Sequence, residues 1–125
     1  MKPKLLLTLA AIFKIIPGIL GLVVPNMAVH EPNASPTLMA NVRVYFPTFI
    51  ALAVLDWFAR DLEPSKARDV IFLANTVGFF LQAIFLFLAA LADGSIDNWI
   101  AGVISLLFAV GFILVGRANM STSAS

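Results

Sequence analysis

Four long apolar runs constrain this chain more than any other feature of its sequence. Each run approaches the ~20 residues that an α-helix needs to cross the hydrocarbon core of a bilayer. Of the 125 residues, 61% are hydrophobic and 12% are charged, whereas a soluble domain is about half apolar and about a quarter charged. A soluble protein of this size has too little interior to bury so much apolar surface. The sequence therefore predicts an all-α, polytopic membrane protein.

Helix-capping residues divide the chain into four predicted transmembrane helices. Ser35 before Pro36 is typical of an N-cap followed by a first-turn proline, and Ser65 is placed to cap the next helix. Gly94 is expected to end the third helix, and Asp97 to be the N-cap of the fourth. The predicted helices cover approximately 4–25, 36–61, 66–92 and 97–117, and 118–125 is expected to be a frayed tail.

The first apolar run has one alternative interpretation, a cleaved signal peptide. Its apolar region is longer than that of a signal peptide, and Lys14 lies at its centre. Cleavage after Ala28 would also place the bulky Asn26 where a small residue is needed. We therefore interpret this run as a retained helix, and residues 1–125 as a single four-helix domain.

The lysines and arginines near the ends of the predicted spans predict the orientation. Cytoplasmic loops of membrane proteins carry an excess of Lys and Arg near the ends of the spans. Arg43 is the basic residue on one side, and the other side carries Lys2, Lys4, Arg60, Lys66, Arg68 and Arg117. We therefore expect both termini to be cytoplasmic, and the short connections favour an up-down-up-down antiparallel bundle.

Two charged residues lie inside predicted spans, where a charge costs about 2.5 to 3.5 kcal/mol on insertion scales. Lys14 shares a helix face with the small residues Ala11, Gly18 and Gly21, which is typical of a helix–helix contact. Helical side chains lean toward their own N-terminus, so Lys14 and Asp56 should converge from antiparallel helices. In the alternative, Lys14 extends to the headgroups, and Asp56 pairs with a basic residue one turn away, Arg60.

The third predicted helix carries two amides, Asn75 and Gln82, on one face. The expected inward stripe of this helix is Asn75, Gly78, Gln82, Phe85 and Ala89. The small residues expected to face inward on the fourth helix are Gly102, Ser105, Ala109 and Gly116. The candidate buried polar cluster is thus Lys14, Asp56, Asn75 and Gln82. It forms either a polar pocket or relay, or interhelical hydrogen bonds of about 0.6 kcal/mol each that fix the packing.

The opposite side of the third predicted helix is rich in large apolar residues. If Asn75 and Gln82 face inward, helical geometry turns a second stripe outward: Phe80, Ile84, Phe87 and Leu91. Phenylalanine offers a large contact area at low entropic cost, which suits a protein partner or a flat pigment. Aromatic residues are also ordinary in spans, so contact with acyl chains is the alternative.

The sequence lacks the residues that several classes of function require. A net charge of +1 without a Lys/Arg block excludes a nucleic-acid partner, and the absence of cysteine excludes disulfides and thiolate metal sites. His30 is the sole histidine, so a bis-histidine haem or a histidine metal cluster cannot form. Gly-rich phosphate loops and nucleophile-base pairs are missing. We therefore expect a protein that is not an enzyme and has neither a metal nor a cofactor.

The layout resembles small four-helix membrane proteins of the DoxX-like kind. The resemblance spans most of the chain as a pattern. The residues that carry it are Gly18, Gly21 and Pro25, Arg43, the segments 59–62 and 66–68, and Asp97-Asn98-Trp99. It implies a membrane protein of unsettled function and no catalytic residues.

The sequence leaves two candidate functions open. The first is an accessory or structural subunit, whose partners are the lipid bilayer and either another membrane protein or further copies of this chain. The second is a bundle that binds or transports a lipophilic small molecule, such as a quinone, a lipid or a pigment, through the buried polar residues. A pocket of several hundred Å³ is the feature that would favour the second function.

Overall fold

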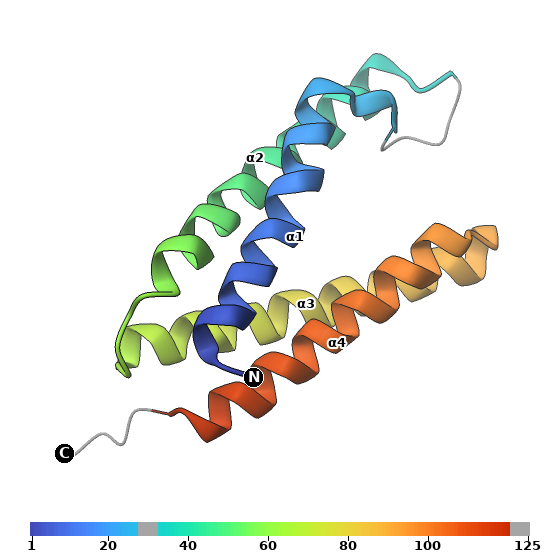
Figure 1. The fold of residues 1–125 in the computed structure, drawn as a ribbon. Coiled ribbons are helices and arrows are strands. Elements are labelled where there is room, and N and C mark those ends of the chain that lie inside the picture. Colours follow the sequence, from blue (N-terminus) through green and yellow to red (C-terminus); the bar gives the residue numbers. More distant parts are fainter. Residues whose placement is uncertain (28–32, 121–125) are drawn as a thin grey trace. The chain divides into compact units, whose positions relative to one another are not determined.

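The computed structural model describes residues 1–27 and 33–120, and all regular structure within them is helical (Figure 1). The elements are α1 (Pro3–Val23), a short 3-10 helix η1 (Pro25–Met27), α2 (Pro36–Ala59), α3 (Lys66–Asp93) and α4 (Ile96–Ala118). All four α-helices are long and apolar enough to cross a membrane. The predicted all-α class is confirmed, and the observed helix ends lie within two residues of the predicted ones. His30 and residues 121–125 of the predicted tail lie outside the described residues.

Three of the predicted helix ends use the residues that the sequence indicated. The Ser35 hydroxyl accepts a hydrogen bond of 3.1 Å from the backbone N–H of Leu38, and Ser65 accepts one of 3.3 Å from Arg68. These bonds satisfy amides that have no partner inside the helix. Gly94 ends α3 with φ of 71°, a left-handed conformation that glycine adopts without a steric penalty.

The N-cap of α4 differs from the prediction. Ser95, and not Asp97, is the cap, because its hydroxyl accepts a hydrogen bond of 3.3 Å from the backbone N–H of Asn98. The Asp93 carboxylate accepts from the backbone N–H of Ser95 at 2.8 Å and from Asn98 Nδ2 at 3.2 Å, which holds this turn closed. Asp97 lies in the first helical turn instead, where its charge is favourable at the positive end of the helix dipole.

The helices belong to two compact units. The α1–α2 unit comprises Leu7–Arg60, and the α3–α4 unit comprises Met1–Leu6 together with the described residues of Asp61–Ser125. Each unit contains one pair of antiparallel helices, which lie side by side in Figure 1.

Small residues bring α1 and α2 together. A Cβ atom on Gly18 would lie 2.9 Å from Ile50 Cγ1, and a Cβ atom on Gly21 would overlap the ring of Phe46. A residue further along α1 thus contacts one earlier in α2, so the two helices run antiparallel. The sequence predicted that Ala11, Gly18 and Gly21 form a close-packing face, and all three are buried.

Aromatic rings hold α3 against α4. The rings of Phe79 and Phe108 stack with centroids 4.8 Å apart, and Phe72 meets Phe112 edge to face at 5.2 Å. These pairs also run in opposite directions along the two helices. Such ring pairs contribute about 0.5–1.5 kcal/mol beyond the area they bury. The predicted small face of α4 is confirmed at its three fully buried members, Gly102, Ser105 and Ala109.

The predicted inward face of α3 is wrong by about one residue, or ~100° about the helix axis. Gly78 is exposed, a Cβ atom added to it would meet no other atom within 4 Å, and Phe85 is 67% exposed. Asn75 of the predicted face is buried, and the other buried residues of α3 are Arg68, Phe72, Phe79, Ala83 and Ala90. The physical reason is size, because Phe72 and Phe79 bury far more surface against Phe108 and Phe112 of α4 than glycine would.

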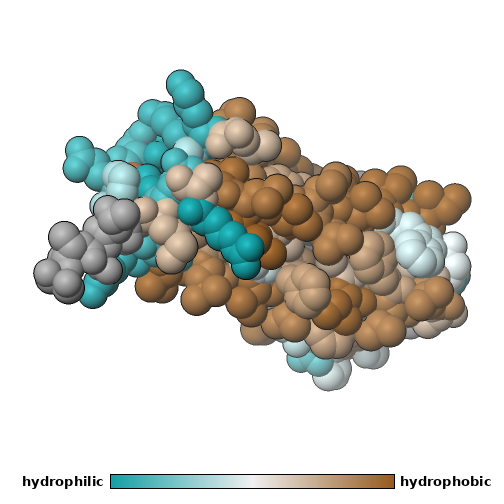
Figure 2. Space-filling model, turned by 90° about the horizontal axis from the view of Figure 1, so that it is seen from below, coloured by the Kyte–Doolittle hydropathy of each residue, from teal (hydrophilic) through white to brown (hydrophobic). Residues whose placement is uncertain are grey.

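Most of the face shown in Figure 2 is hydrophobic. On α2 the buried residues are Ala53, Asp56 and Ala59, whereas large apolar side chains such as Phe58 and Val44 are exposed. Exposed apolar surface of this extent is unfavourable in water and favourable in contact with acyl chains. This distribution therefore fits the membrane-protein class that the composition predicted.

Candidate functional site

One charged residue of α1 and one of α2 meet inside the α1–α2 unit. Lys14 Nζ lies 2.6 Å from Asp56 Oδ2, and the two side chains are 9% and 1% exposed. This is the contact predicted from the convergence of antiparallel helices. Lys14 and Asp56 therefore form a buried, hydrogen-bonded ion pair between α1 and α2.

Small neighbours on both helices make the ion pair possible. Ala53 and Ala59 lie one turn to either side of Asp56, and both are 2% exposed. Ala11 lies one turn before Lys14 and is similarly buried. Short side chains let the backbones approach, so that the ammonium reaches a carboxylate that points back along its own helix.

Arg60, the alternative partner predicted for Asp56, lies at the end of α2 against an aromatic ring. The guanidinium carbon of Arg60 lies 3.4 Å from the centroid of the Trp57 ring, which is a cation–π contact. Arg60 is also the C-cap residue of α2, and its backbone N–H donates to the carbonyl of Asp56. The arginine therefore caps the helix and covers an aromatic ring at its end.

The α1–α2 unit also contains an apolar cavity. A cavity of about 170 Å³ in the same unit is lined by Ala11, Ile12, Ile15, Ala53, Val54, Trp57 and Phe58. All of its lining side chains are apolar or aromatic, and neither Lys14 nor Asp56 belongs to the lining. Because Lys14 and Asp56 are both buried, removal of either one would leave the charge of the other inside the unit without this ion pair.

The other two residues of the predicted polar cluster lie on α3, in the α3–α4 unit. Asn75 is buried, and its Nδ2 donates a hydrogen bond of 3.0 Å to the carbonyl of Ile71 in its own helix. Gln82 was predicted to be buried but is only partly so, because α3 turns Phe79 and Ala83 toward α4 in its place. Within the α1–α2 unit, Lys14 and Asp56 are in contact, and within the α3–α4 unit Asn75 is buried.

Three of the four residues of the predicted partner face of α3 are exposed, and the fourth, Phe87, is only partly exposed. Phe80, Ile84 and Leu91 are 49%, 39% and 71% exposed. Phe87 instead packs against α4, with its ring centroid 5.4 Å from that of Trp99. A Cβ atom on Gly102 would lie 2.6 Å from the Phe87 ring, so this glycine makes room for it.

A groove of about 420 Å³ in the α3–α4 unit was not foreseen from the sequence. Its floor is mainly apolar, and two charged residues, Asp69 of α3 and Arg117 of α4, also line it. The full lining is Asp69, Val70, Phe72, Leu73, Thr76, Phe112, Ile113, Gly116, Arg117 and Met120. The sequence feature that relates to this groove is a large residue, Phe72, opposite a small one, Gly116. This pairing cannot be recognised until the alignment of α3 with α4 is known.

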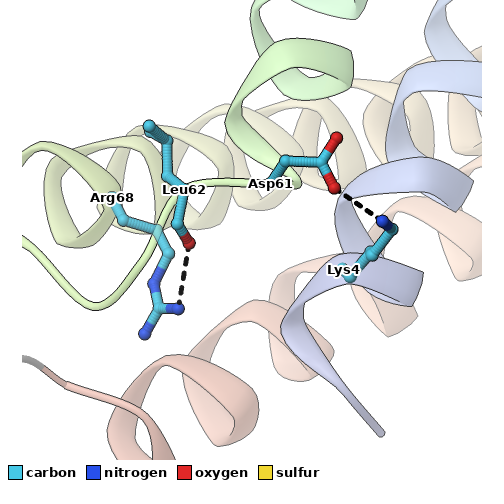
Figure 3. A network of polar contacts seen from close by, with 4 residues as sticks. All are labelled: Lys4, Asp61, Leu62 and Arg68. Atoms are coloured by element: carbon cyan, nitrogen blue, oxygen red, sulfur yellow. Dashed lines mark hydrogen bonds and ion pairs between the residues drawn. The ribbon is translucent and has the colours of Figure 1, made fainter.

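A polar network near this groove ties one end of the α3–α4 unit together (Figure 3). Arg68 is buried, and its guanidinium donates to the carbonyls of Leu62, at 3.4 Å, and Asn119, at 2.7 Å. The exposed pair of Lys4 and Asp61 is 2.6 Å apart. From the sequence, Arg68 was expected only to contribute positive charge near a loop. Its hydrogen bonds could not be predicted, because the carbonyls that accept them belong to residues elsewhere in the chain.

Comparison with protein-family models, curated proteins and solved structures found no match. Within residues 1–27 and 33–120, no three histidine, cysteine, aspartate or glutamate side chains are grouped to hold a metal ion. Among the described residues, the candidate features are the buried ion pair, the apolar cavity of the α1–α2 unit and the groove with a charged residue on α3 and on α4.

Proposed function

We propose that this chain is a non-catalytic, multi-pass membrane protein that serves as an accessory or structural subunit of a larger membrane complex or of a homo-oligomer. The observation that carries the proposal is the Lys14–Asp56 ion pair, in which the buried charges of α1 and α2 bind each other. In the described part of the chain, every buried side-chain nitrogen or oxygen has a hydrogen-bonding partner. Polar groups used in this way specify how helices pack. The resemblance to DoxX-like membrane proteins belongs to the same proposal.

The proposed topology is an up-down-up-down bundle with both termini cytoplasmic. Its first support is the excess of basic residues on one predicted side. A second support lies in the α3–α4 unit, where Lys4 pairs with Asp61 and Arg68 reaches Leu62 and Asn119. These contacts gather the beginning of α1, the connection between α2 and α3, and the end of α4. Those three segments must share one side of the membrane in this topology.

The outer surface of α2 and α3 supports a role in association. Large side chains such as Tyr45 and Phe58 on α2 and Phe80 on α3 are exposed. Aromatic side chains of this kind are enriched at protein interfaces, where they contribute more binding energy than most residues. These helices therefore offer a surface to another membrane protein or to a second copy of the chain.

Purification from the native membrane in a mild detergent tests the subunit role. We expect the tagged protein to elute either with a stoichiometric membrane partner, identified by mass spectrometry, or as an oligomer of defined mass. Crosslinking in intact membranes before solubilisation is the control for losses in detergent. A strictly monomeric protein that brings down nothing and forms no crosslink would refute the proposal.

The second candidate function, binding of a lipophilic molecule, is favoured by the α3–α4 groove. Its volume of about 420 Å³ lies in the range of small-molecule pockets, about 300–1,000 Å³. None of the four residues of the predicted polar cluster lines this groove. If the chain binds such a molecule, Asp69 and Arg117 are thus the charged residues that the groove offers.

A further inference from the structure

The α3–α4 groove combines an apolar floor with one charge of each sign. Asp69 lies in the first turn of α3, and Arg117 lies in the last turn of α4. Because the helices are antiparallel, both charges are at the same end of the unit. Phe72, Leu73 and Phe112 extend from this end along the floor of the groove. A ligand that fits must therefore be apolar along its length and charged at one end.

We propose that this groove binds one phospholipid whose headgroup carries both a phosphate and a primary ammonium, as in phosphatidylethanolamine. The proposal rests on the proposed membrane insertion and is independent of the subunit role. An acyl chain occupies the apolar floor, and the headgroup lies where α3 begins and α4 ends.

The two charged side chains match the two headgroup charges. Arg117 is an exposed residue, and the planar array of N–H groups of a guanidinium suits a phosphate. The Asp69 carboxylate accepts hydrogen bonds, which a primary ammonium donates. A basic residue between helices at the membrane surface is a known setting for lipid headgroups.

The same chemistry predicts discrimination between lipids. A quaternary ammonium, as in phosphatidylcholine, has no N–H group to donate to Asp69. The headgroup of phosphatidylglycerol has no cation, so it brings a phosphate close to the Asp69 carboxylate without an ammonium that could bind that carboxylate. We therefore expect retention of phosphatidylethanolamine over both.

Native mass spectrometry of the delipidated full chain tests the proposal. The chain is incubated in detergent with phosphatidylethanolamine, phosphatidylcholine and phosphatidylglycerol of identical acyl chains. We expect phosphatidylethanolamine adducts to dominate, and Arg117→Gln and Asp69→Asn each to lower them about tenfold, as expected for loss of a charged hydrogen bond. Equal retention of the three lipids, or preference for phosphatidylglycerol, would overturn the proposal.

Matched variants separate headgroup recognition from general effects of charge. Lys66→Gln removes a basic residue at the same end of α3, and Asp97→Asn removes a first-turn acid from α4, and neither residue lines the groove. Both should retain phosphatidylethanolamine as the wild type does. If either lowers retention as much as the groove variants do, the recognition does not reside in Asp69 and Arg117.

A third pair of variants tests whether the acyl chain occupies the groove. Leu73 lines it and is 63% exposed, whereas Leu107 on α4 is 66% exposed and does not line it. Leu73→Trp should abolish lipid retention and Leu107→Trp should not. Unchanged retention in Leu73→Trp would overturn the placement of the lipid in this groove.

Helicity by circular dichroism and a single species in gel filtration verify that each variant is folded. Resistance of the wild type to alkaline carbonate extraction measures membrane insertion on its own. Extraction by carbonate would refute the membrane proposal and the lipid proposal together. Insertion without lipid discrimination would refute the lipid proposal alone.

Discussion

Lys14 of α1 and Asp56 of α2 form an ion pair of 2.6 Å in which both side chains are almost completely buried. The described part of the chain holds a second pair of the same length, Lys4 with Asp61, whose side chains are 65% and 57% exposed. The two pairs thus share chemistry and distance but differ in environment. They offer an internal comparison of what burial does to an ion pair.

The first prediction concerns the coupling within the two pairs. Lys14→Leu and Asp56→Leu should each destabilise the protein by about 3–5 kcal/mol, because each leaves a buried charge without its partner. The double variant should lose much less than the sum of the two single losses. Reversible unfolding in mixed detergent measures the stability of the wild type and the three variants.

The Lys4 and Asp61 pair is the control for this cycle. Exposed pairs contribute about 0–1 kcal/mol because water screens them, so its coupling should be small. Additive losses for Lys14 and Asp56, or equal coupling in the two pairs, would contradict a role for the buried pair in stability.

The second prediction concerns the glycines of α1 and α3. Gly21→Ala should destabilise the α1–α2 unit by about 1–3 kcal/mol, because the added methyl group overlaps the Phe46 ring. Phe46→Leu in the same chain should recover part of the loss by shortening the opposing side chain. Thermal unfolding followed by circular dichroism measures the changes.

Gly78→Ala is the matched control, since nothing lies within 4 Å of its added methyl group. Alanine in a helix interior is favoured over glycine by about 0.5–1 kcal/mol, so this variant should be neutral or more stable. If Gly78→Ala were as damaging as Gly21→Ala, Gly78 would face a neighbouring helix and the observed rotation of α3 would be wrong.

The third prediction concerns topology. Because the chain contains no cysteine, single cysteines at Asn33, Ser65, Ser95 and Ser121 can be labelled without background. An impermeant thiol reagent applied to intact cells should label positions 33 and 95, and should label positions 65 and 121 only after the membrane is opened. Labelling of position 65 or 121 in intact cells contradicts cytoplasmic termini.

The fourth prediction separates the outer and inner phenylalanines of α3. Phe80→Leu preserves hydrophobicity but changes shape on an exposed surface, so it should weaken association with a partner and leave stability within about 0.5 kcal/mol. Phe87→Leu should instead lower stability by about 1 kcal/mol or more, because Phe87 fills the space beside Gly102 and Trp99. Co-purification and unfolding are measured on both variants. Association unchanged in Phe80→Leu would remove this residue from the interface.

The helix ends show what local sequence determines. Ser35, Ser65 and Gly94 act at the ends predicted for them, because a cap needs only the amides or carbonyls of its own turn. The Lys14–Asp56 contact also followed from the sequence. An intramembrane charge requires a partner, and few were available.

The rotation of α3 was decided by tertiary structure. Its sequence offers two stripes at helical spacing, one through Gly78 and Gln82 and the other through Phe72 and Phe79, and periodicity alone cannot choose between them. The choice follows from the fit of the Phe79 ring to Phe108 and Phe112, a contact that exists only when α4 is in place. The partial exposure of Gln82, the inward position of Phe87 and the groove beside Phe72 all follow from that choice. The sequence by itself thus determined, to within two residues, where the helices begin and end. Packing determined which side of α3 is buried, because shape complementarity is a property of two surfaces.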